Sequence, residues 1–245
     1  MAGPDPLDRP AFYALRPGGW RDLLTLLHPP YTAWHLSYVA LGAATAPELH
    51  GDRLAATLLA FFLAVGVCAH ALDEFNGRPL RTLLSDGVLV GLAVAGLAGA
   101  VAIGIVGAAT VSLGLLPFVP AGAFIVTAYN LELFRGRFHS DFWFAAAWGA
   151  FPALTAYWIN ALQLRPQGVL VAAGCFTLTV AQRHLSTPVR ELRRHTLSIS
   201  GRQHLTDGTT IELDAQRLAA PLDHALRACA LALALLATGL VIARL

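Results

Sequence analysis

The longest stretch without a charged side chain runs from residue 87 to residue 131, 45 residues in all. A helix needs about 20 apolar residues to cross the roughly 30 Å hydrocarbon core of a bilayer, so this stretch is long enough for two crossings. It contains Pro117 and Pro120, and we expect two membrane helices joined by a tight turn near Gly107. The stretch therefore indicates an integral membrane protein.

Other apolar stretches each fit a single crossing: residues 31–48, 54–72, 142–164, 166–182 and about 222–243. The chain is 56% hydrophobic and only 13% charged, which excludes an ordinary soluble domain of this length. We therefore predict an all-α fold, a polytopic integral membrane helical bundle with about seven transmembrane helices.

Arginine indicates the orientation, because the chain contains no lysine. Thirteen arginines lie in the amino-terminal segment and in the loops after the second, fourth and sixth predicted spans, against three on the other side. The positive-inside rule then places the amino terminus in the cytoplasm and the carboxyl terminus outside the cell membrane. The formal net charge of +2 reflects this asymmetry and gives no reason to propose a nucleic-acid partner.

We expect four parts along the chain. Residues 1–30 form a cytoplasmic segment in which residues 16–27 can lie along the membrane surface as an amphipathic helix. Residues 31–185 form a core of six transmembrane helices, and residues 219–245 contain the last one. Between them, residues 186–218 begin with a proline turn and a short basic helix. Alternating apolar residues on either side of Asp207-Gly208 then predict a β-hairpin, in a cap over the cytoplasmic helix ends.

Polar residues gather at the predicted cytoplasmic helix ends, which predicts a cytoplasm-facing cavity. His70, Asp73 and Glu74 are spaced to share one face of a helix, and Arg78 follows in the next loop. Carboxylates suit Mg²⁺ and arginine suits phosphate, whereas His70 makes a transition metal an alternative. These residue types are equally ordinary at a helix end, so a structural role remains open. Further candidates for the chemistry at this end are Tyr129, Glu132, Asp141, Arg183 and His184.

Two segments resemble the UbiA superfamily of intramembrane prenyltransferases. One is Asp73-Glu74 followed by Arg78-Pro79-Leu80, and the other is residues 129–158, with a tyrosine, a basic loop and a Gly149 to Pro152 pattern. The resemblance covers roughly residues 25–185. It implies a helical bundle whose cavity opens to the cytoplasm and to lipid, and in which two acid-rich motifs hold Mg²⁺ and the diphosphate of an isoprenoid donor.

Carried over by position, the resemblance implies that Asp73 and Glu74 are metal or diphosphate ligands, Arg78 is a diphosphate contact and Tyr129 lines the cavity. The chain departs from the family in helix number, with seven expected where nine are usual, and in three features of its motifs. Its first motif is compressed to one acid pair, it has Gln182, Arg183 and His184 where the second acid motif belongs, and Arg135 is the nearest substitute for an expected lysine.

Three substitutes for the missing acids are open. Glu132 and Asp141 can supply carboxylates, Arg183 and His184 can bind diphosphate directly, or a different metal can be held by His70, Asp73 and His184. The leading functional hypothesis is a UbiA-like membrane enzyme that transfers or cyclises an isoprenoid group from a prenyl diphosphate. The alternatives are a non-catalytic protein that binds membrane lipid or a partner, and a metal-dependent membrane enzyme using His70 with Asp73 and Glu74.

Overall fold

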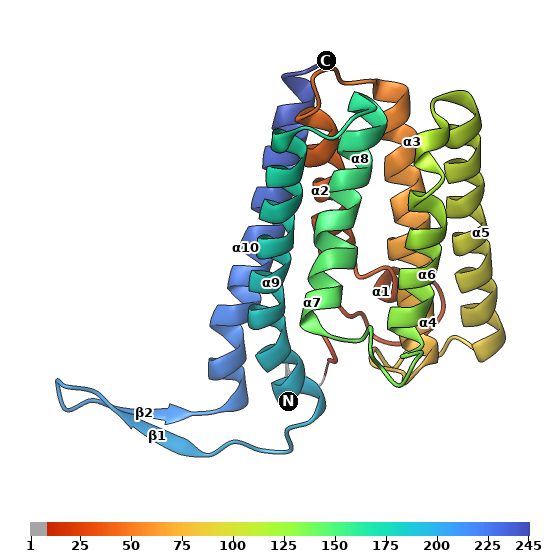
Figure 1. The fold of residues 1–245 in the computed structure, drawn as a ribbon. Coiled ribbons are helices and arrows are strands. Elements are labelled where there is room, and N and C mark those ends of the chain that lie inside the picture. Colours follow the sequence, from red (N-terminus) through yellow and green to blue (C-terminus); the bar gives the residue numbers. More distant parts are fainter. Residues whose placement is uncertain (1–8) are drawn as a thin grey trace.

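The computed structural model describes residues 9–245 and shows a bundle of long, roughly parallel helices with a β-hairpin at one end (Figure 1). The helices are α1 (Trp20–Leu26), α2 (Pro29–Ala44), α3 (Gly51–Phe61), α4 (His70–Phe75), α5 (Asp86–Thr110), α6 (Phe118–Asn130), α7 (Asp141–Phe144), α8 (Phe151–Ala161), α9 (Pro166–Arg194) and α10 (Ala215–Ile242). The strands are β1 (Gly201–His204) and β2 (Thr210–Leu213).

Two of the long helices contain a π-helical stretch. Phe62–Ala69 (η2) joins α3 to α4, so the helix is continuous over residues 51–75, and Ala145–Ala150 (η4) joins α7 to α8 in the same way. Such wider turns are rare in proteins, and those that occur are often found at functional sites. Each stretch leads into the polar end of its helix, where the candidate site lies.

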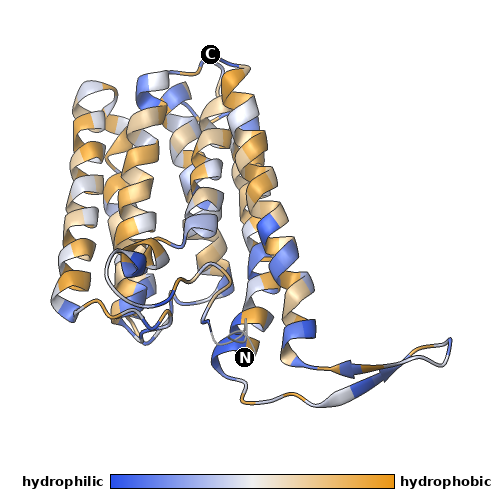
Figure 2. Cartoon of the chain, turned by 180° about the vertical axis from the view of Figure 1, so that it is seen from behind, coloured by the Kyte–Doolittle hydropathy of each residue, from blue (hydrophilic) through white to orange (hydrophobic). Residues whose placement is uncertain are grey.

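Four helical segments of the described chain are long and apolar enough to cross a membrane: Gly51–Phe75, Asp86–Thr110, Leu113–Asn130 and Ala215–Ile242. Only 17% of the most apolar window of Asp86–Thr110 is buried, so most of its side chains face outward. Figure 2 shows apolar residues along most of the length of the helices and hydrophilic residues mainly towards their ends. An outward apolar surface of this extent confirms a helical membrane protein.

The centre of the bundle is α2, which packs between α8 and α10. A Cβ added at Gly42 would lie 2.1 Å from the backbone oxygen of Ala153, so only glycine allows α2 and α8 to approach this closely. Trp34 and Tyr38 are buried on α2, and the Tyr38 hydroxyl accepts hydrogen bonds from Trp34 Nε1 and from Thr179 on α9. This close packing fixes the position of α9 relative to α2.

The turn between the two halves of the 87–131 stretch lies at Val111-Ser112, later than the expected position near Gly107. Helix α5 continues to Thr110, and the Ser112 hydroxyl then accepts the backbone N–H of Gly114 at 3.3 Å. Gly107 serves a different purpose, since an added Cβ would lie 3.0 Å from the Leu115 side chain. The absence of a side chain at Gly107 allows Leu115 of the following segment to approach α5.

Helix α9 continues to Arg194, so the expected proline turn and separate basic helix after residue 185 were wrong. Pro188 lies inside the helix and cannot donate a backbone hydrogen bond to the carbonyl of His184. His184 is at an exposed position, where water can satisfy that carbonyl. The boundary between the core and the following segment therefore falls within a continuous helix.

The hairpin is present, with Arg202 opposite Glu212 and a turn in which the Asp207 carboxylate accepts the N–H of Thr209 at 2.9 Å. Gly208 adopts a φ of 85° in that turn, a conformation that glycine adopts at no steric cost. The ribbon projects sideways from the bundle (Figure 1), and all four residues of β1 are exposed. It therefore does not cover the helix ends as expected.

The amphipathic helix expected within residues 16–27 corresponds to α1, which exposes Trp20, Leu23 and Leu24. Its Asp22 is buried and accepts the backbone N–H groups of Gly18 at 3.0 Å and Leu83 at 3.1 Å. This carboxylate therefore ties α1 to the loop that follows α4. Residues 1–8 of the expected segment lie outside the described chain.

Candidate functional site

A cavity of about 460 Å³ lies at the arginine-rich end of the bundle. We call it the polar cavity. Its walls come from the 10–13 segment, α2, α4, the end of α6, the loop before α7, η4 and α9. Its charged residues and histidines are His28, His35, His70, Asp73, Glu132, His139, Arg183, Arg190, Arg193, Arg194, His195 and Asp223. Among residues 9–245, four arginines and three acids line it, so this described lining carries more positive than negative charge.

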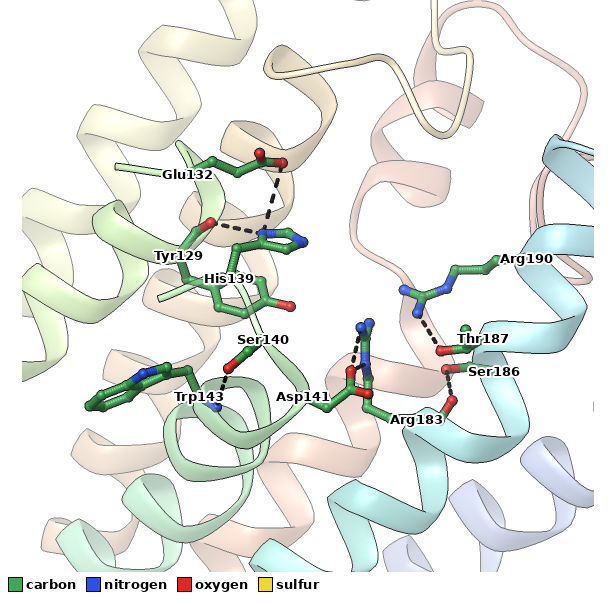
Figure 3. Close-up of polar contacts among 10 residues, drawn as sticks. All are labelled: Tyr129, Glu132, His139, Ser140, Asp141, Trp143, Arg183, Ser186, Thr187 and Arg190. Carbon is green, nitrogen blue, oxygen red and sulfur yellow. Dashed lines mark hydrogen bonds and ion pairs between the residues drawn. The ribbon is translucent and has the colours of Figure 1, made fainter. Parts of the chain in front are cut away.

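The four arginines come from the last turns of one helix, α9. Arg183, Arg190 and Arg194 are spaced by seven and four residues, which places them along one face of a helix. In Figure 3 the side chains of Arg183 and Arg190 face Tyr129 and His139 across open space. The continuation of α9 past Pro188 is what gives the cavity this wall.

Arg183 is held at the rim by Asp141, the first residue of α7. Its Nε and a terminal nitrogen both lie 2.7 Å from the same carboxylate oxygen of Asp141. The guanidinium also lies over the ring of Phe144, with its central carbon 4.9 Å from the ring centroid. The Arg183 side chain is 15% exposed and that of Asp141 is 61% exposed, so the pair is open to solvent on the acid side.

Arg190 is half-buried and donates to the Thr187 hydroxyl at 3.0 Å. Within residues 9–245, no carboxylate lies within ion-pair distance of it. An anion in the cavity can therefore pair with the Arg190 guanidinium without displacing a carboxylate of residues 9–245.

Arg193 and Arg194 connect α9 to its neighbours. Arg193 lies 2.5 Å from the Asp223 carboxylate of α10, and both side chains are at most 6% exposed. Arg193 and Arg194 also donate at 3.3 Å to the backbone oxygens of Arg9 and Pro10, respectively. These bonds hold the 9–13 segment against α9, where residues 10–13 line the cavity.

Aromatic and imidazole rings form the opposite wall. His28 and His70 are stacked with centroids 4.0 Å apart, and the Tyr13 hydroxyl lies 2.7 Å from His28 Nδ1. Burial lowers the pKa of His28 well below its ordinary value, with the neighbouring His70 as the next cause, and burial raises the pKa of Tyr13. His28 is therefore neutral in the folded protein, and it adds no positive charge to this wall.

Among residues 9–245, the buried polar atoms in this cavity that have no hydrogen-bond partner include Nε2 of His28, Oε1 of Gln182 and Oδ1 of Asp223. Gln182 is only 3% exposed and belongs to the arginine-bearing end of α9. Buried polar atoms are nearly always paired, so orphaned atoms that line a cavity suggest a polar ligand or water there.

The structure separates the acids of the predicted trio. Asp73 lines the polar cavity beside His70, but Glu74 is fully buried on the other side of α4. Its carboxylate accepts the backbone N–H groups of Leu80 and Thr82 and the Thr82 hydroxyl, each at 2.8 Å. Glu74 therefore stabilises the 78–82 loop and does not face the cavity.

Tyr129 and Glu132 line the cavity as well. The Tyr129 ring is stacked on His139 at 4.4 Å, and His139 Nδ1 lies 4.0 Å from a carboxylate oxygen of Glu132. Besides Glu74, three predicted site residues lie outside the cavity. Arg78 pairs with Asp86 and donates to the backbone oxygen of Leu84, whereas Arg135 and His184 are exposed and do not line the cavity.

The predicted metal site does not fit these positions. No group of three His, Cys, Asp or Glu side chains in the part of the chain that the structure describes is placed to hold a metal ion. With Glu74 turned away, Asp73 is the acid of the predicted trio that lines the cavity, and Nδ1 of His70 lies 3.2 Å from the backbone oxygen of Gly66. A metal held by His70, Asp73 and Glu74 is not supported by this donor set.

A second cavity of about 510 Å³ lies between α3, η2, α5, α6 and α8. We call it the apolar cavity, because its lining is mostly Ala, Val, Ile, Leu, Phe and Gly, with Asp52 and Arg53 at the far end. Among the described residues, Trp148 alone lines both cavities. Its side chain thus lies between the polar and the apolar space.

Sequence reasoning missed the direct contribution of Arg190, Arg193 and Arg194, and of the 10–13 segment. The spacing of the arginines is visible in the sequence, but it predicts a shared helix face only if the helix continues past Pro188. Comparison with protein-family models, curated proteins and solved structures finds no match to the chain.

Proposed function

We propose that this protein is a UbiA-like membrane enzyme that binds the diphosphate of an isoprenoid donor in the polar cavity and transfers or cyclises the isoprenoid group. The observation that carries the proposal is the wall of α9, where Arg183 and Arg190 face the cavity and Arg190 has no acidic partner among residues 9–245. Guanidinium groups bind phosphate oxygens bidentately, which suits a diphosphate.

We propose that the chain crosses the membrane seven times, because α2, the 141–161 helix and α9 run beside the four apolar spans. The polar cavity lies at the arginine-rich end, which the positive-inside rule assigns to the cytoplasm. The carboxyl terminus lies at the opposite end of the bundle (Figure 1) and is then outside.

The chemistry follows from charge. In the proposed reaction the bond between the allylic carbon and the diphosphate oxygen breaks, and the diphosphate leaves with the electron pair. The Arg183 and Arg190 guanidinium groups would offset the charge that builds on the leaving group. The rings of Tyr129, Phe144 and Trp148 would face the allylic cation, which aromatic faces attract, until an acceptor traps it. We assign no protein-held metal to this step.

The test is diphosphate release by purified protein from dimethylallyl and geranyl diphosphate, with and without added Mg²⁺, alongside the binding of inorganic diphosphate. Arg190→Gln should weaken diphosphate binding by at least tenfold and lower release. The matched control is Arg202→Gln, which removes the same charge from the exposed hairpin. Equal diphosphate affinity in wild type and Arg190→Gln would overturn the proposal.

The second candidate is a non-catalytic lipid-binding protein on the same scaffold. It is favoured by the single carboxylate, Asp73, left in the cavity from the predicted acid pair, with Glu74 bound to the loop. This candidate predicts diphosphate binding that depends on Arg190 without any diphosphate release. Native mass spectrometry would then find an anionic lipid bound to the purified protein.

A further inference from the structure

Trp148 is positioned to separate two spaces of different character. On one side lies the polar cavity with Arg183 and Arg190, and on the other lies the apolar cavity beyond Val65 and Val126. Trp148 is 3% exposed and packs with Val65, Val126 and Tyr129 in one buried cluster. The ring is therefore a wall of both cavities.

The surrounding structure holds this wall in place. The Trp148 ring is stacked on Phe144 with centroids 5.4 Å apart, and it lies 4.7 Å from the Tyr129 ring. Its backbone oxygen is 2.8 Å from Nδ1 of His35, which is itself buried on α2. These contacts on both side chain and backbone fix the ring at the boundary.

The volume of the polar cavity limits the chain length of a ligand whose diphosphate head is bound by the arginines. A water molecule occupies about 30 Å³ of liquid, so the polar cavity has room for on the order of fifteen water-sized groups. A diphosphate with one or two isoprene units is of about this size. A longer chain would have to pass the Trp148 ring into the apolar cavity.

We propose that Trp148 is the residue that sets the longest hydrocarbon chain accepted with a diphosphate head in the polar cavity. This inference rests on the proposed function, since it takes the head to be bound by the α9 arginines. Replacing the indole by a small side chain joins the two cavities, and the apolar lining beyond Val126 then accepts the rest of a longer chain.

The test measures dissociation constants of purified wild type, Trp148→Ala and Trp148→Leu for inorganic diphosphate and for dimethylallyl, geranyl, farnesyl and geranylgeranyl diphosphate. In wild type, we expect the affinity to rise up to the geranyl compound and to fall by at least tenfold at the geranylgeranyl compound. Both variants should bind the geranylgeranyl compound at least tenfold more tightly than wild type, with unchanged affinity for inorganic diphosphate.

A second substitution controls for indirect effects. Val126→Phe in the Trp148→Ala background refills the space behind the missing ring and should restore the preference for short chains. Trp148→Leu retains part of the packing, so it reports on chain length even if Trp148→Ala fails to fold.

The outcomes separate the two proposals. Wild-type affinity that does not fall with chain length, or folded variants with the wild-type length preference, would overturn the role of Trp148 while diphosphate binding stands. Wild type that binds no diphosphate at all would overturn the proposed function, and this inference with it.

Discussion

The Glu74 carboxylate is bound to Thr82, whose backbone N–H and hydroxyl both donate to Oε1 at 2.8 Å. The other carboxylate oxygen accepts the N–H of Leu80 at 2.8 Å. Between these residues the chain turns through Arg81, which adopts a φ of 56°. A backbone with a left-handed residue needs support from its surroundings, and the buried carboxylate provides it.

Glu74→Gln should therefore lower stability more than it lowers ligand binding. The amide offers one oxygen and an NH₂ group, which cannot accept the N–H groups that the carboxylate accepts. Hydrogen bonds to a charged group contribute about 1.5–3 kcal/mol each, so we expect a loss of about that size in the free energy of unfolding. Thermal unfolding in detergent measures it.

The matched control is Glu212→Gln, whose side chain is 81% exposed on the hairpin and should change stability by less than about 0.5 kcal/mol. A Glu74→Gln protein of unchanged stability that no longer binds diphosphate would show that Glu74 belongs to the site after all.

The buried pair of Arg193 and Asp223 makes a second prediction. Asp223→Asn removes the carboxylate from this buried ion pair, and breaking a buried ion pair typically costs about 3–5 kcal/mol. Replacing both partners with apolar residues of similar size, as in Arg193→Met with Asp223→Leu, should recover most of that loss. Chemical denaturation of the two variants and wild type measures the difference, and a double variant as unstable as Asp223→Asn would contradict it.

Stability should also depend on pH through His28. Its pKa is lowered by burial in the folded protein, whereas an unfolded histidine has a pKa near the ordinary 6.5. Between these two values the unfolded chain binds more protons, so stability rises with pH and falls as the pH is lowered below about 6.5. Melting temperatures from pH 8 to pH 5 measure this loss.

His28→Asn removes the titrating group and keeps a residue that tolerates the φ of 45° at this position. It should flatten the pH dependence in part. His204→Asn on the exposed hairpin should leave the pH dependence unchanged. A variant at residue 28 with the wild-type pH profile would contradict the assigned cause.

The helical membrane character was predictable because uncharged stretches have few stable alternatives in lipid. Each predicted span became a helix, and the Asp-Gly turn became a hairpin. The site was less predictable, because it depends on which way a side chain points. Asp73 and Glu74 are adjacent in sequence, but one faces the cavity and the other faces the loop, and no spacing rule decides between these for the last turn of a helix.

The row of cavity-lining arginines on α9 could not be predicted for a related reason. Pro188 is a strong signal for a helix end, and only the packing of α9 against its neighbours overrides it. Once the helix continues, Arg190, Arg193 and Arg194 join Arg183 at the cavity. The direction of that helix is a tertiary property, which local sequence does not contain.

Asp141 gives the last prediction, because it is bound to Arg183 and competes with any anion for that guanidinium. Asp141→Asn should free Arg183 and raise the affinity for inorganic diphosphate by about two- to fivefold. A partly exposed ion pair contributes up to about 1 kcal/mol, which corresponds to a change in affinity of this size. The gain should shrink at high salt, which screens the charges. Isothermal titration at two salt concentrations measures it, with Glu212→Gln as the charge-matched control on the hairpin. If Asp141 instead supplied a missing metal ligand, Asp141→Asn would weaken Mg²⁺-dependent diphosphate binding, so the sign of the change separates an arginine-based site from a metal-based one.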